Sequence, residues 1–143
     1  MPESHSMRIR IATWNLDRSG ARNRSRWALQ LAQLDRVGAD ILVLTEAHED
    51  QAGAGMRGAF SSPGSTPYTS RERAVAIWSR WDVELLPVSD PRLCACVRVA
   101  LPAPSAQLIV YGTVIPYADD GVRTGQAVRW ERHRLGAAMV ARD

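Results

Sequence analysis

The chain has 143 residues, the size of one domain with room for a hydrophobic core. Its 45% hydrophobic and 23% charged residues are typical of a globular protein and exclude a disordered or collagen-like chain. No apolar run reaches the roughly 18 residues of a membrane-spanning helix, and residues 1–7 lack the apolar stretch of a secretory signal. We therefore expect a cytoplasmic protein with no membrane span.

The net charge of +3 comes from an unusual set of bases, because all 18 basic residues are arginine. A high-GC coding bias explains this most simply. The functional interpretation of this arginine content is that guanidinium groups bind phosphate through two parallel hydrogen bonds, which suits an anionic ligand. The two cysteines, Cys94 and Cys96, alternate in a strand-like stretch, and we expect them to be buried thiols on one face.

The start of the chain alternates between a strand pattern and a helix pattern. Residues 8–14 predict a strand that ends at Asn15. Apolar side chains at helical spacing then predict a helix over residues 24–37, for which Gly38 is a natural stop.

The middle of the chain is dominated by strand patterns. Residues 41–44 are apolar without interruption, which predicts a strand buried on both faces that ends at Glu46. Residues 51–70 are rich in glycine, serine and proline and predict a long surface excursion. Two strand pairs are expected after it, 74–78 with 83–88 and 93–101 with 107–114.

The end of the chain has a helical pattern, marked by Trp130, Leu135 and Met139. No glycine cap follows this pattern, and several apolar strands lack a segment that would cover them. Uncovered apolar strands are normally avoided in a complete domain. We therefore expect this chain to be part of a larger fold.

Three ordered segments resemble the endonuclease/exonuclease/phosphatase superfamily, the DNase I-like and exonuclease III-like phosphoesterases. Residues 10–16 resemble the opening strand that ends in Trp-Asn. Residues 39–46 are similar to the Asp-Ile strand that ends in Glu, with Thr45 where the family more often has Gln. Residues 74–80 and 108–117 resemble the central Ser-Arg strand and the later strand with its substrate loop.

This resemblance implies an α+β fold, the N-terminal part of a four-layer α/β/β/α sandwich, and hydrolysis of phosphate esters with Mg²⁺ or Mn²⁺. Glu46 matches the metal-ligating glutamate, and Asn15 matches the asparagine beside the metal that orients the site. Arg80 and Tyr117 are expected to approach the substrate phosphate. Val114 stands where many relatives carry an aromatic residue or a histidine, and a valine side chain can neither donate a proton nor bind phosphate.

Each of these side chains also has a purely structural interpretation. Glu46 can be a solvated carboxylate at a strand end, and Asn15 can be a turn or cap residue. Tyr117 can be a partly buried residue or a surface ring. For Arg80, an ion pair with Asp82 is the stronger expectation.

Neighbouring polar and aromatic residues are expected to be structural. Glu49 and Asp50 could supplement a metal site, but a solvated acidic loop is the usual case. We expect His48 on the surface. The five tryptophans are expected in the core or at its rim.

The family's Gly-Asp-x-Asn strand and its terminal Ser-Asp-His motif do not occur in this sequence. We expect residues 1–7 to form a flexible tail and residues 8–143 to form the N-terminal portion of the family's domain, with negligible hydrolytic activity alone. Relatives with the fold that this resemblance implies act on nucleic acids, phospholipids or small phosphoesters, so the resemblance does not select a substrate. A second hypothesis is a non-catalytic α/β module that binds an anionic partner through its arginines.

Overall fold

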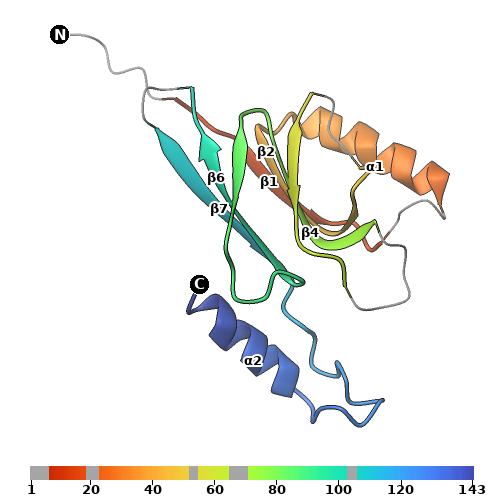
Figure 1. The fold of residues 1–143 in the computed structure, drawn as a ribbon. Coiled ribbons are helices and arrows are strands. Elements are labelled where there is room, and N and C mark those ends of the chain that lie inside the picture. Colours follow the sequence, from red (N-terminus) through yellow and green to blue (C-terminus); the bar gives the residue numbers. More distant parts are fainter. Residues whose placement is uncertain (1–6, 19–22, 52–54, 65–70, 103–105) are drawn as a thin grey trace.

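The computed structural model describes residues 7–18, 23–51, 55–64, 71–102 and 106–143. The predicted tail therefore lies outside the described residues, except for Met7. Two β-sheets pack face to face, and one helix covers the outer face of the first sheet (Figure 1). The mixed α/β architecture with two sheets agrees with the predicted fold class.

The first sheet has four strands in the order β1-β2-β4-β3. Its members are β1 (Ile11–Asn15), β2 (Ile41–His48), β4 (Glu72–Ser79) and β3 (Arg57–Phe60). β1 and β2 are parallel, whereas β4 is antiparallel to both β2 and β3. Consequently the carboxyl ends of β1 and β2 lie at the same end of the sheet as the start of β4.

The second sheet has three antiparallel strands in the order β5-β6-β7. They are β5 (Val83–Leu86), β6 (Cys94–Ala100) and β7 (Gln107–Thr113). The predicted pairing of β6 with β7 is confirmed, but the predicted pairing of residues 74–78 with 83–88 is wrong. Both edges of β4 are occupied by β2 and β3, so the chain crosses to the other sheet before β5 begins.

The predicted excursion over residues 51–70 contains β3, an edge strand that the composition did not reveal. Its glycine is required by packing, because a Cβ on Gly58 would lie 2.6 Å from Cζ3 of Trp78. Residues 52–54 and 65–70 of this segment lie outside the described residues. A glycine that is typical of a loop can thus belong to a strand where an indole ring passes close to the backbone.

Helix α1 (Arg24–Val37) has the predicted bounds. Asn23 caps its start by accepting a hydrogen bond from the Arg26 backbone N–H at 3.0 Å. Gly38 ends the helix in the left-handed conformation, with φ 57°. These local signals explain why the sequence located this helix correctly.

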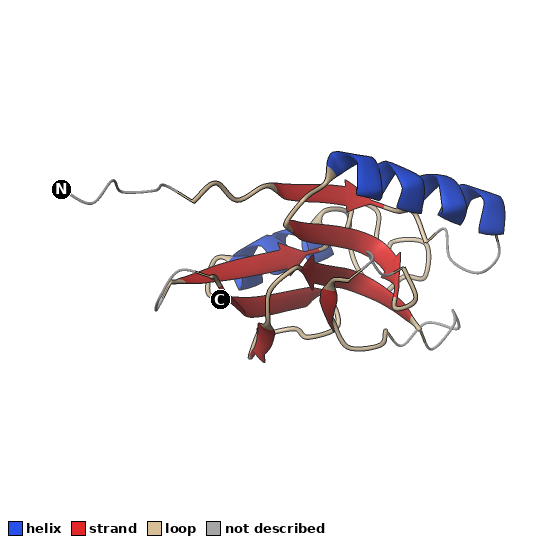
Figure 2. Ribbon diagram, turned by 90° about the horizontal axis from the view of Figure 1, so that it is seen from above, coloured by secondary structure: helices blue, strands red, loops and turns tan. Residues whose placement is uncertain are grey.

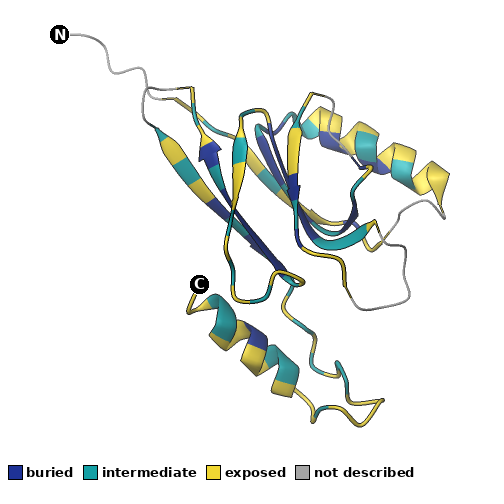
Figure 3. Cartoon of the chain, viewed as in Figure 1, coloured by how far each residue is buried: buried dark blue, intermediate teal, exposed yellow. Residues whose placement is uncertain are grey.

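The first sheet lies between α1 and the second sheet (Figure 2), and buried residues pack on both of its faces (Figure 3). One cluster fills the space under α1 and includes Leu34, Leu42 and Leu44. The other fills the space between the sheets. The strand over residues 41–44 is therefore covered on both faces, as predicted. Cys94 and Cys96 are buried free thiols, also as predicted.

Helix α2 (Glu131–Val140) lies near one end of the two sheets (Figure 1). His133 Nδ1 lies 2.9 Å from the Pro116 carbonyl oxygen, which ties the helix to the segment that follows β7. Within the described residues, none of the helices is both long and apolar enough to cross a membrane.

Candidate active site

The side chains of Asn15 and Glu46 meet where the parallel strands β1 and β2 end. Asn15 pairs with Thr45 in the strand register, so Glu46 is the next residue along β2. The Asn15 Nδ2 donates a hydrogen bond to Glu46 Oε1 at 3.2 Å. The Glu46 side chain is 29% exposed and remains accessible to a ligand. The structure thus brings together the two residues that the sequence predicted as the core of the site.

Backbone hydrogen bonds hold the chain that leaves β1 against the end of β2. The Leu16 N–H donates to the Thr45 carbonyl at 2.9 Å, and the Arg18 N–H donates to the Glu46 carbonyl at 3.0 Å. The Asp17 N–H donates to Asn15 Oδ1 at 2.8 Å. The oxygen of the Asn15 carboxamide is therefore engaged by the backbone, and its nitrogen faces Glu46.

Glu46 has an unusual backbone conformation, with φ 49°. Non-glycine residues in this left-handed region cost on the order of 1 kcal/mol and occur frequently at functional sites. The residues around Glu46 keep their pairing, because Thr45 still faces Val75 and Ala47 still faces Arg73. The strand therefore continues on both sides of Glu46 while the conformation at this residue redirects its side chain.

Glu46 lines a cavity of about 850 Å³ between the ends of the sheets and α2. The first sheet and the turn after β1 contribute charged side chains, namely Arg18, Glu46, Glu72 and Arg73. The opposite wall includes Asp90, Arg92, Asp120, Arg132 and Arg142. The cavity is large enough for a small phosphoester or for one nucleotide of a longer substrate.

Glu72 is a candidate site residue that the sequence analysis missed. It begins β4 and lines the same cavity as Glu46, and its Oε2 is buried without a hydrogen-bond partner among the described residues. A buried carboxylate oxygen without a partner is costly and is compatible with a bound water or cation. The signal that could have identified Glu72 is its position at the start of a strand antiparallel to β2, but this requires knowledge of the pairing.

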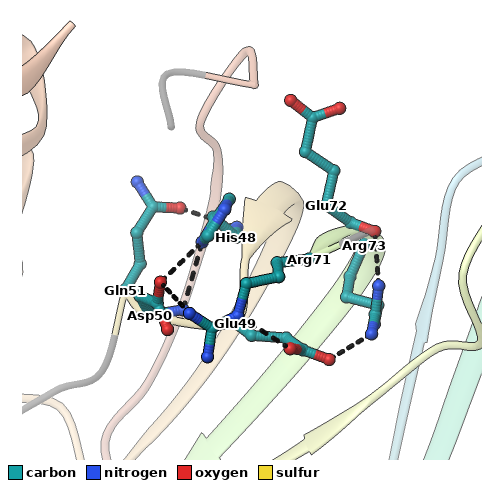
Figure 4. A network of polar contacts seen from close by, with 7 residues as sticks. All are labelled: His48, Glu49, Asp50, Gln51, Arg71, Glu72 and Arg73. Carbon is teal, nitrogen blue, oxygen red and sulfur yellow. Dashed lines mark hydrogen bonds and ion pairs between the residues drawn. The ribbon is translucent and has the colours of Figure 1, made fainter. Parts of the chain in front are cut away.

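Glu49 and Asp50 form ion pairs with arginines of the neighbouring strand region (Figure 4). Arg71 Nη1 lies 2.9 Å from Asp50 Oδ2, and Arg71 Nε lies 3.6 Å from Glu49 Oε2. Arg73 also binds Glu49, and its side chain is only 9% exposed. The two acidic residues are thus neutralised by arginines, and the expectation of a simply solvated acidic loop is wrong.

Arg80 lies at the opposite end of the first sheet from Glu46. Ser79 pairs with Ile41 at the start of β2, and Arg80 Nε lies 3.4 Å from Asp40 Oδ1. The expected ion pair between Arg80 and Asp82 is wrong, because Asp82 instead pairs with Arg57 at 2.9 Å. The antiparallel direction of β4 causes this separation: the strand begins beside the candidate site and ends away from it.

Tyr117 is a surface residue, with 70% exposure. It follows β7, and its neighbour Pro116 lines the cavity together with Val114. The structure therefore places the chain after β7 at the cavity, as the sequence suggested, but leaves the Tyr117 ring in solvent.

His48 is buried, with 4% exposure, so the expectation of a surface histidine is wrong. Its ring centroid lies 5.5 Å from that of Trp27 in α1. Among the other tryptophans, Trp78 belongs to the core, whereas Trp14 and Trp130 are partly exposed.

Asp90, one of two aspartates on the opposite wall of the cavity, has a pKa below its usual value. Burial acts to raise the pKa of Asp90, but hydrogen bonds from Arg92 and the charge of its guanidinium hold the pKa below the usual value. The Asp90 carboxylate accepts from Arg92 Nε at 3.2 Å. This part of the cavity wall is therefore an internally paired charge cluster.

The described residues contain no cluster of three or more histidine, cysteine, aspartate or glutamate side chains arranged for a metal ion. The first sheet contributes the carboxylates of Glu46 and Glu72 to the lining of the cavity, and Asp90 and Asp120 line its opposite wall. Mg²⁺ is commonly bound by one or two carboxylates together with water and substrate phosphate, so this donor set is compatible with it.

Comparisons with known proteins identify relatives of this architecture. The family described as "Endonuclease/Exonuclease/phosphatase family" matches residues 12–142. A search among curated proteins finds no match.

Solved structures with a similar fold include one endonuclease domain and two forms of TDP2. The endonuclease domain of TRAS1, a telomere-specific non-LTR retrotransposon, is 15% identical with a TM-score of 0.51, over 76% of this chain and 46% of that structure. Truncated Caenorhabditis elegans TDP2 is 15% identical with a TM-score of 0.57, over 79% of this chain and 48% of that structure. Humanized D. rerio TDP2 is 14% identical with a TM-score of 0.57, over 80% of this chain and 50% of that structure. These similarities establish a DNase I-like fold, and the chain spans about half of the length of these structures.

Proposed function

Because this chain belongs to the endonuclease/exonuclease/phosphatase family, we propose that it carries one part of a metal-dependent phosphoesterase site. The observation that supports this proposal is the contact between Asn15 and Glu46 at the mouth of a charged cavity. Such a carboxylate, held on the end of a buried strand, suits a hard cation.

In this proposal Glu46 holds Mg²⁺ or Mn²⁺, and Asn15 orients the Glu46 carboxylate. The hydrogen bond from Asn15 Nδ2 favours this orienting role over direct ligation by Asn15, since its oxygen accepts from the Asp17 N–H. Glu72, at the start of β4, is a second acidic residue in the lining of this cavity. When bound, the cation would neutralise phosphate charge and lower the pKa of a bound water.

The proposed substrate is a phosphate ester, and nucleic acid is the first class to test. The fold neighbours include an endonuclease domain, which motivates this choice without establishing it. Tyr117 is exposed at the edge of the cavity region and can contact an extended substrate, whereas Arg80 is too far along the sheet to share one phosphate with Glu46.

We expect the 143-residue chain alone to have negligible hydrolytic activity. The sequence lacks the Gly-Asp-x-Asn and Ser-Asp-His motifs that carry the nucleophile and phosphate contacts in the family it resembles. The test is hydrolysis of a fluorescent single-stranded oligonucleotide and of bis(p-nitrophenyl) phosphate with Mg²⁺, compared with cation binding measured by Mn²⁺ titration. Mn²⁺ binding without turnover is expected. Turnover that Glu46→Ala abolishes would show that the chain is sufficient for catalysis.

The alternative function is an anion-binding module, and the ion pairs of the arginines argue against it. Among the residues that the structure describes, ten arginines each lie within 4.0 Å of a carboxylate, which reduces the number of free positive charges available to a partner. This module would bind a polyanion with steep salt dependence and without any effect of Mg²⁺ or Glu46. Measuring oligonucleotide binding against salt, with and without Mg²⁺, distinguishes the two functions.

A further inference from the structure

We propose that Gln30 and Gln51 are positioning residues for the candidate site, which they support from the side that faces α1. Together they connect the backbone after Asn15 with the backbone after Glu46. We call these two side chains the glutamine bridge. Its role in cation binding rests on the proposed function, whereas its effect on Asn15 does not.

The glutamine bridge is a continuous line of hydrogen bonds. The His48 N–H donates to Gln51 Oε1 at 2.8 Å, and Gln51 Nε2 donates to Gln30 Oε1 at 3.4 Å. Gln30 Nε2 then donates to the Leu16 carbonyl at 3.2 Å. Figure 4 shows the first of these contacts, between Gln51 and His48. The line therefore begins two residues after Glu46 and ends one residue after Asn15.

The two ends of the line determine how both carboxamides are oriented. A backbone N–H can only donate and a carbonyl can only accept, so the His48 end requires the Gln51 oxygen and the Leu16 end requires the Gln30 nitrogen. The middle contact then has the one arrangement that satisfies both side chains. Each bond in such a line polarises the next, which favours the bridge as a unit.

Burial makes the glutamine bridge specific rather than incidental. Gln30 is 5% exposed and Gln51 is 1% exposed, although glutamine is normally a surface residue. Leu16, whose carbonyl is the acceptor, is fully buried. An apolar side chain could fill the same space under α1, but it could not bind the Leu16 carbonyl.

The connection to Asn15 passes through the two peptide units on either side of the Leu16 Cα. The Leu16 N–H is bound to the Thr45 carbonyl of β2, and the Leu16 carbonyl is bound to Gln30 of α1. With both groups of Leu16 engaged, the backbone on the C-terminal side of Asn15 has little freedom to rotate. The glutamine bridge thereby sets the direction from which the Asn15 carboxamide meets Glu46.

The test compares Gln30→Met and Gln51→Met with Gln33→Met, a matched control on the exposed face of α1. The first readout is the side-chain NH₂ resonance of Asn15 in the ¹⁵N-labelled, metal-free protein. The second is the dissociation constant for Mn²⁺, measured at a temperature well below the midpoint of thermal unfolding. We expect both bridge variants to shift the Asn15 resonance and to weaken Mn²⁺ binding by about tenfold, and we expect the control to do neither.

The outcomes separate the glutamine bridge from the proposed function. An unchanged Asn15 resonance in folded Gln30→Met and Gln51→Met would overturn the bridge. A wild-type protein that fails to bind Mn²⁺ while its bridge variants still shift the Asn15 resonance would retain the bridge and overturn the metal site. The wild-type protein supplies a test that needs no variant: side-chain amides of Gln30 and Gln51 that exchange with solvent as fast as those of Gln33 would also overturn the bridge.

Discussion

At the scale of single residues, the candidate site combines a strained backbone with a small number of polar contacts. Glu46 adopts a left-handed conformation, receives a hydrogen bond from Asn15 and faces a cavity that also contains Glu72. None of these features improves packing in the core. Their combination at one edge of the sheet is what distinguishes Glu46 from an ordinary carboxylate at a strand end.

Glu46→Gln should remove cation binding while the fold is retained. The amide has the same shape as the carboxylate but lacks the negative charge that a hard cation prefers. We expect the dissociation constant for Mn²⁺ to rise about tenfold or more, measured by titration calorimetry. The matched control is Glu84→Gln, an exposed residue of β5 paired with Arg98, which should leave the constant unchanged. Equal effects of the two substitutions would contradict the assignment.

Glu72→Gln should raise stability and weaken cation binding at the same time. The buried Oε2 of Glu72 has no partner among the described residues, so replacing the carboxylate by a neutral amide relieves part of its desolvation cost. We expect a gain of about 1 kcal/mol in the free energy of unfolding, measured by urea denaturation. Loss of stability would indicate that Glu72 has a structural role instead.

At the scale of elements, α1 and the first sheet are specified by different kinds of interaction. The helix has an asparagine cap at its start and a left-handed glycine at its end, both within its own sequence. The sheet depends on partners from four separate segments. This difference explains why the sequence predicted the bounds of α1 correctly but missed β3 and the partners of β4.

Asn23→Ala should destabilise α1 because it removes the side-chain acceptor for the Arg26 N–H. The expected cost is about 1 kcal/mol in the free energy of unfolding. Thermal unfolding followed by circular dichroism measures this change. Asn23→Ser is the control, since serine retains a capping oxygen and should recover most of the stability. If alanine and serine behaved alike, the cap would contribute nothing.

At the scale of the whole molecule, the two sheets come into close contact at Gly112 of β7. A Cβ on Gly112 would lie 2.6 Å from Val75 Cγ1 and 2.9 Å from Val43 Cγ1. These contacts are far shorter than van der Waals separation, so glycine at this position determines the distance between the sheets. The cavity beside Glu46 lies at one end of the same two sheets.

Gly112→Val should therefore destabilise the entire sandwich. The added side chain forces the sheets apart, at a cost of about 1–3 kcal/mol or more. A lower urea midpoint with an unchanged denaturant slope is the expected result. Ile109→Val, an exposed position of the same strand, is the control and should change the midpoint little. A Gly112→Val protein as stable as the control would show that the sheets can separate freely.

The direction of the strands decides which of the predicted site residues lie close together. Asn15 and Glu46 come together because parallel neighbouring strands end at the same edge, which the sequence order already suggested. Arg80 was expected near the phosphate, but β4 is antiparallel and carries Arg80 to the other end. Glu72 was missed for the same reason, since the start of β4 lies beside the end of β2.

Short-range sequence patterns were enough to predict the bounds of α1, the buried strand over residues 41–44, the free buried thiols and the ordered motifs of the family. The partners of β4, the burial of His48 and the line of contacts through Gln30 and Gln51 became evident only in the folded chain. Periodicity records which face of an element is apolar, and caps act within a few residues. Strand pairing and buried polar contacts instead join segments that are distant in the chain, and no local pattern specifies which distant partner each will meet.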